Sequence, residues 1–313
     1  MRTAGRVALS KPLPGGGVTT SGAVTILAIE TATLSVGAAL ANENGLLAAF
    51  EVRAGRRHAE LLHGVVMSVL EVTGLGFGDL DCIAVDVGPG LFTGIRVGVA
   101  AAKGFAVALG VPVVGLTSLE ILASACRATG DHDAVGVVDL RRGEVAWAMP
   151  SAEDAPGVSR HGPPELLAAE LAERLAAGAG GGTAGGAGAA SSGRERPVLA
   201  GESALSGGRE RSVLAGESAL SGGREPIVLA GDGAIRYAEI LTAGRYGRVL
   251  VAGPELAAPP VASLAVRGMT ELAAGRAVDP LAVRPTYLRE ADVRINWTTR
   301  HDAPAAGRGE VKA

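Results

Sequence analysis

The chain has 313 residues, enough for one large domain or two modest ones. Hydrophobic residues make up 48% of it and aromatic residues only 3%, so we expect a core packed from aliphatic side chains. The net charge of −3 argues against a protein that grips nucleic acid by itself through a basic face. The two cysteines, Cys82 and Cys126, form no CxxC pair or metal-ligand cluster, and so few cysteines fit a reducing cytoplasm.

The first half of the chain alternates strand and helix signals. Residues 1–22 are rich in Gly, Pro, Thr and basic residues, lack the apolar stretch of a secretion signal and predict a disordered leader. Continuous apolar runs then predict three strands in a row, followed by helix, strand, helix and strand. These elements are expected at residues 24–30, 36–40, 46–52, 58–72, 81–87, 93–109 and 111–116.

The second half repeats this theme around a low-complexity segment. Strands are predicted at 134–140 and 144–149, and helices at 163–175 and 260–275. Residues 176–193 are almost all Ala, Gly, Ser and Thr, which cannot bury enough apolar surface to order themselves.

A short strand-like motif, Val-Leu-Ala-Gly, recurs with a spacing of 15 residues. Its three copies begin at Val198, Val213 and Val228. Each copy is one strand plus a linker, too little for a repeat architecture, so we interpret the copies as a tandem duplication. Only the copy at Ile227–Gly231 leads into a helix, so we expect the fold to use that one and the others to lie in loops.

This order predicts an α/β protein with two lobes, of the actin-like and sugar-kinase-like ATPase (ASKHA) fold. The expected boundaries are a disordered leader at 1–22, a first lobe at 23–128, a second lobe at 129–297 and a disordered tail at 298–313. A disordered insert is expected inside the second lobe at about 176–224.

Five stretches together resemble the TsaB (YeaZ) family. They are ILAIETAT at 26–33, RHAELL at 57–62, VGPGLFTGIRVG at 87–98, VPVVGLTSL at 111–119 and PTYLR with a later tryptophan at 285–297. The GPG-x-FTG-x-R pattern is long and unusual. The resemblance covers most of residues 24–297 apart from the low-complexity insert.

The resemblance implies a non-catalytic subunit in the synthesis of N6-threonylcarbamoyladenosine (t6A) at position 37 of tRNA. The related catalytic subunit TsaD carries an Asp–Glu pair and two metal-binding histidines. Matched to this sequence, the acids fall on Leu34 and Ser35 and the histidines on Ser118 and Leu122. None of these side chains can supply an imidazole nitrogen or a carboxylate. We therefore expect a degenerate nucleotide and metal site, no cofactor on this chain alone, and ATP and metal on TsaD and on the ATPase subunit TsaE.

The apolar helices at 58–72 and 93–109 carry more apolar surface than one core contact needs. The family pairs with TsaD through first-lobe helices, which implies that these helices bind TsaD, or a second copy of the chain when TsaD is absent. The expected interface residues are Leu61, Leu62, Val65, Val66, Val69, Ile95, Val99 and Lys103. We expect tRNA to be reached only through the complex.

An enzyme of the actin-like ATPase class, acting in its own interlobe cleft, is the alternative function. The Gly-Pro-Gly turn before a helix could cradle a phosphate, with contacts from Gly88, Pro89, Gly90 and Thr93. Asp86 and Asp139 each end an apolar strand and could face the cleft. Residues 97–116 are too interrupted to predict a membrane span, so a cytoplasmic protein is expected.

Overall fold

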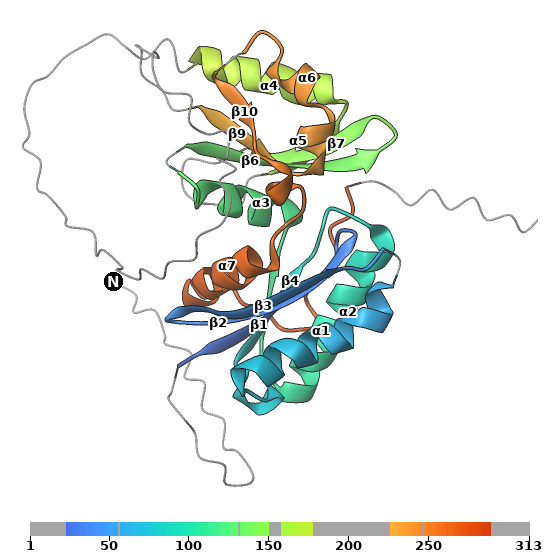
Figure 1. Ribbon diagram of the computed structural model, residues 1–313, viewed down its shortest axis with the longest axis vertical. Coiled ribbons are helices and arrows are strands. Elements are labelled where there is room, and N and C mark those ends of the chain that lie inside the picture. Colours follow the sequence, from blue (N-terminus) through green and yellow to red (C-terminus); the bar gives the residue numbers. More distant parts are fainter. Residues whose placement is uncertain are drawn as a thin grey trace, which may run out of the picture.

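The computed structural model describes residues 23–55, 57–130, 132–149, 158–177, 226–245 and 247–288. The leader, most of the insert, the tail and the motif copies that begin at Val198 and Val213 lie outside the described residues. Two lobes are stacked one above the other, each built on one sheet (Figure 1). The expected two-lobed α/β fold is confirmed.

The first sheet has five strands in the order β3-β2-β1-β4-β5. The strands β1, β2 and β3 form an antiparallel meander, and β4 and β5 continue from β1 in parallel. Their bounds are Thr25–Glu30, Ser35–Asn42, Gly45–Arg53, Cys82–Asp86 and Val113–Leu116. Because β1, β2 and β4 are buried on both faces, their continuous apolar runs were readable as strands.

The second sheet repeats this topology in the order β10-β9-β6-β7-β8. Its central strand β6 pairs antiparallel with β7 and parallel with β9, as β1 does with β2 and β4. The strand bounds are Asp133–Arg141 (β6), Glu144–Ala148 (β7), Ser159–Gly162 (β8), Ile227–Ala230 (β9) and Val249–Val251 (β10). The third motif copy therefore forms β9, as expected.

Helices lie on both faces of each sheet (Figure 1). The outer face of the first sheet carries α1 (His58–Thr73) and α2 (Phe92–Leu109), each ended by a left-handed glycine, Gly74 or Gly110. A 3₁₀ turn, η1 (Phe77–Asp79), follows α1. By length and apolarity alone α2 could span a membrane, but its buried stripe packs on the first sheet as in a core helix.

Between the two sheets lie α3 (Ser118–Arg127) and α7 (Val261–Ala273). The short helix α3 was not expected, although Thr117 and Glu120 cap its start reciprocally. The far face of the second sheet packs against α4 (Pro164–Ala177) and α6 (Ala238–Thr242). Two short elements, α5 (Asp232–Arg236) and η2 (Pro254–Leu256), complete the second lobe.

The expected boundary of the second lobe at residues 129–297 was wrong for its last helix. Although α7 follows the second sheet in sequence, Val261, Leu264 and Ala265 on it pack against the inner face of the first sheet. Contact is close enough that a methyl group on Gly37 of β2 would lie 2.9 Å from the Val261 side chain. The chain thus returns to the first lobe, because that inner apolar face needs a cover.

Candidate functional site

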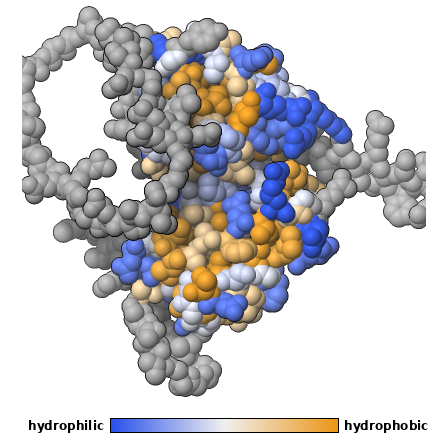
Figure 2. All heavy atoms as spheres, viewed as in Figure 1, coloured by the Kyte–Doolittle hydropathy of each residue, from blue (hydrophilic) through white to orange (hydrophobic). Residues whose placement is uncertain are grey.

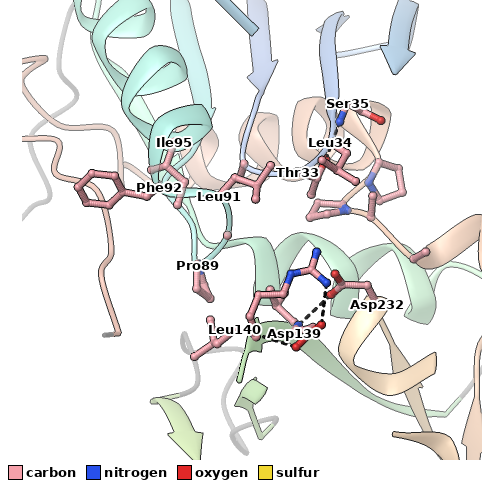
Figure 3. Close-up of a pocket in the computed structure, with 18 of the residues that line it drawn as sticks. Thr33, Leu34, Ser35, Pro89, Leu91, Phe92, Ile95, Asp139, Leu140 and Asp232 are labelled. Carbon is pink, nitrogen blue, oxygen red and sulfur yellow. Dashed lines mark hydrogen bonds and ion pairs between the residues drawn. The ribbon is translucent and has the colours of Figure 1, made fainter. Parts of the chain in front are cut away.

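A cleft of about 820 Å³ opens between the two lobes (Figure 3). The first lobe contributes the loop after β1, part of β3, and the turn and first residues of α2. The second lobe contributes the end of β6, Asp232 at the start of α5, and the segment around η2. In Figure 3 Pro89 points from the first lobe toward Leu140 and Asp139 of the second.

Two buried carboxyl groups, Glu30 and Asp86, lie at matching ends of the parallel strands β1 and β4. Burial raises the pKa of Glu30 well above its usual range, and the neighbouring Asp86 raises it further. Burial also raises the pKa of Asp86 to about 7, although hydrogen bonds from Gly88 and Ser118 favour its charged form. The expectation that Asp86 faces the cleft was wrong, because its side chain is buried beneath it.

These carboxyl groups hold the loops that form the cleft wall. The amide of Ala32 donates to Oε1 of Glu30 at 2.7 Å, and the amide of Gly88 donates to Oδ1 of Asp86 at 2.7 Å. The hydroxyl of Ser118 donates to Asp86 at 2.8 Å, which ties the start of α3 to the same point. Sequence reasoning missed Glu30, although an acid ending a wholly apolar strand was a signal.

The glycine-rich turn is built for close packing. A methyl group on Gly90 would lie 2.2 Å from the carbonyl oxygen of Ala32. A methyl group on Gly94 would lie 2.0 Å from the backbone oxygen of Thr31, and one on Gly98 would lie 2.2 Å from the hydroxyl oxygen of Thr31. Glycines four residues apart on α2 thus let the helix approach the loop after β1.

The four nucleotide-contact candidates are only partly brought together at the cleft. Pro89 and Gly90 line it, whereas the amide of Gly88 is used by Asp86. Thr93 is exposed and lies outside the lining, so its contact with a nucleotide stays a prediction. The turn therefore offers little free N–H surface to a phosphate.

The second-lobe wall carries Asp139, which does line the cleft as expected. Its Oδ2 atom pairs with Arg141 at 3.0 Å and with Arg236 at 3.4 Å. Its amide donates to Asp232 at 2.8 Å, and burial raises the pKa of Asp232. The charge of Asp139 is thus already balanced by protein cations.

Metal-ligand chemistry is sparse across the part of the chain that the structure describes. No group of three or more His, Cys, Asp or Glu side chains there could hold a metal ion. Leu34 and Ser35, at the positions of TsaD's acids, line the cleft, while Leu122 lies in the core. Neither Leu34 nor Ser35 can supply a carboxylate to the cleft.

The interface residues expected on α1 and α2 lie mostly inside the molecule. Leu62, Val65, Val66, Val69, Ile95 and Val99 are all buried in the core of the first lobe. Leu61 and Lys103 are half-buried. The six buried positions were wrong as contact residues, because the apolar stripe that reads most strongly in the sequence is the one facing the sheet.

The surface available to a partner is the outer face of these helices. We define it by its exposed small and apolar residues: Ala59, Gly64, Met67 and Val72 on α1, and Ala100, Gly104 and Val107 on α2. Val72 is 78% exposed and Val107 59% exposed. Open space surrounds Gly64 and Gly104, so another helix could approach closely there. Figure 2 shows hydrophobic residues gathered over the first lobe.

Known proteins resemble this chain in sequence. The family described as "TsaD: tRNA N6-adenosine threonylcarbamoyltransferase" matches residues 52–154. The TsaB proteins of Escherichia coli and Bacillus subtilis are 36% and 37% identical to this chain. Each alignment covers 39% of this chain and 53% of the relative. The chain is a homologue of the TsaB (YeaZ) proteins.

The likeness extends beyond the aligned part at the level of fold. YeaZ from Pseudomonas aeruginosa is 24% identical, with a TM-score of 0.59, and the match covers 85% of this chain and all of that one. A tRNA N6-adenosine threonylcarbamoyltransferase of Ruegeria is 46% identical over 78 residues, 21% of its length. In sequence, the chain spans about half the length of the TsaB proteins it matches.

Proposed function

We propose that this chain is a non-catalytic subunit of the machinery that makes t6A at position 37 of tRNA. The observation that carries the proposal is the identity of 36–37% with two proteins named for t6A biosynthesis. The cleft adds support, since its TsaD-like positions carry Leu34 and Ser35, and Asp139 is already paired. The chain acts in the cytoplasm and binds no ATP or metal alone; these belong to TsaD and TsaE.

TsaD binds the outer face of α1 and α2, and TsaE joins the resulting complex. The small residues on this face, which lie beside the exposed Glu60 and Glu71 of α1, suit helix-to-helix packing, because a missing side chain lets backbones approach. Such a contact excludes water and resembles a divided core. The same face pairs two copies of the chain when TsaD is absent.

The test places a large charged side chain in open space on this face. Gly64→Arg and Gly104→Arg should leave the fold intact, since neither position has a neighbour within 4 Å. Both should abolish binding to the TsaD protein of the same organism, measured by size-exclusion chromatography. Ala172→Arg, at an exposed position of α4 in the second lobe, is the matched control and should bind normally. Normal binding by both glycine variants would contradict the proposed docking face.

The alternative is an ATP-binding enzyme that acts in its own cleft. It is favoured by one observation, a cleft of about 820 Å³ lined by both lobes. Saturable ATP hydrolysis by the purified chain, lost on Asp139→Asn, would support it. We expect none, because Asp139 is paired with arginines and Gly88 is engaged by Asp86.

A further inference from the structure

Two side chains of α2 and one that is distant in sequence form an exposed cluster at the cleft edge, which we call the Arg96 cluster. It consists of Phe92 and Arg96 on α2 and Tyr287 near the end of the described chain. The guanidinium carbon of Arg96 lies 3.7 Å from the centre of the Phe92 ring. Its Nε donates to the hydroxyl of Tyr287 at 2.8 Å, and the two rings are 5.3 Å apart.

The cluster is held in place by the backbone behind it. The amide of Thr286 donates to the carbonyl of Val87 at 2.7 Å, which fixes the final segment beside the turn before α2. Phe92 and Arg96 are four residues apart and so share one face of the helix. Guanidinium and rings are therefore preorganised, which lowers the entropy lost when a ligand stacks on them.

This arrangement is left open to solvent. Phe92 is 40% exposed and Tyr287 43% exposed, in a chain with only nine aromatic residues. Figure 3 shows Phe92 pointing away from the centre of the cleft to its edge. No carboxylate among the described residues forms an ion pair with Arg96, so its charge is not balanced by a nearby acid.

Exposed rings beside a guanidinium plane that has no carboxylate partner among the described residues are suited to unpaired nucleobases. Bases stack on aromatic rings and on arginine planes, and the positive charge attracts the phosphate beside the base. We propose that the Arg96 cluster binds an unpaired base of RNA, which gives this subunit a tRNA contact of its own. The inference rests on the proposed role in tRNA modification.

The test uses an RNA hairpin whose unpaired loop carries one 2-aminopurine, a base whose fluorescence is quenched on stacking. The full chain, without TsaD, is titrated into this probe, and a saturable quench is expected. Arg96→Ala and Tyr287→Ala should each weaken binding by about tenfold, the size of one lost stacking contact. Arg96→Lys keeps the charge but loses the plane, and it should fall between wild type and Arg96→Ala. Tyr287→Phe keeps the ring and should retain most of the affinity.

Phe50→Ala is the matched control, because Phe50 is an aromatic residue of edge strand β3 with 48% exposure, outside the cleft lining. Loss of quenching with Phe50→Ala equal to that with Arg96→Ala would overturn the inference. So would an unchanged quench in the Arg96 variants, or equally effective competition by the free mononucleotide. TsaD binding is scored separately by size-exclusion chromatography. A wild-type chain that quenches the probe but fails to bind TsaD therefore contradicts the proposed function alone.

Discussion

Replacing Gly94 by alanine should destabilise the chain, whereas the same change at Gly104 should stabilise it. Both glycines lie inside α2, so alanine gains about 1 kcal/mol of helix propensity at each. At Gly104 nothing lies within 4 Å, and this gain stands alone. At Gly94 the new methyl group would lie 2.0 Å from the backbone oxygen of Thr31, which no side-chain rotation can relieve.

The size of the Gly94 effect follows from two losses. Moving α2 away from the loop after β1 costs about 1–3 kcal/mol, as overpacking does elsewhere. The movement also breaks the buried hydrogen bond from the Thr31 hydroxyl to the Gly94 carbonyl, 2.8 Å long, worth about 1 kcal/mol. Set against the propensity gain, the expected net destabilisation is about 2 kcal/mol, and the two variants should differ by about 3 kcal/mol.

Equilibrium urea unfolding, followed by circular dichroism, measures this difference for wild type and both variants. The midpoint should fall for Gly94→Ala and rise slightly for Gly104→Ala, with similar slopes. A Gly94→Ala protein as stable as Gly104→Ala would refute the view that the glycines of this motif serve helix packing. The alternative interpretation, in which the glycine-rich turn binds a phosphate, would then be favoured.

Two further predictions concern buried polar groups. The pKa of Asp86 is raised from 3.8 to about 7, so the folded state binds more protons than the unfolded state between these values. Stability should therefore fall as pH rises through this window, and the fall should be smaller in the Asp86→Asn variant. The measurement is the urea midpoint from pH 4 to 8, and an equal dependence on pH in wild type and variant would contradict this prediction. Trp147 is fully buried, and its indole N–H donates to Glu170 at 2.9 Å. Trp147→Phe should lower the free energy of unfolding in urea by about 2 kcal/mol, because it leaves a cavity and removes the hydrogen bond to Glu170. An unchanged free energy of unfolding would count against this packing.

The sequence predicted the fold where burial is two-sided. Runs such as Thr25–Glu30 and Cys82–Asp86 are apolar throughout, and that pattern has few alternatives to a central strand. The short helix α3 was missed, although the Thr117–Glu120 pair that caps it was visible. The return of α7 to the first lobe could not be predicted, because helical periodicity shows which face is apolar and not which sheet it covers.

The candidate site was harder to predict for a related reason. Apolar residues such as Val66 and Val69 dominate α1, and periodicity alone cannot separate the stripe on the sheet from a stripe on a partner. The available face is instead marked by small residues, Gly64 and Gly104, which carry little signal in a hydrophobicity pattern. The Arg96 cluster depends on Tyr287 meeting α2 across 191 residues, a contact that only the folded chain reveals.

The central claim is that the outer face of α1 and α2 binds TsaD. It is tested most directly by size-exclusion chromatography with light scattering on the chain alone and mixed with the TsaD protein of the same organism. We expect a homodimer of the chain alone that gives way to a heterodimer with one copy of each protein. Separate elution of the two proteins at all mixing ratios, each with its unmixed mass, would contradict the claim.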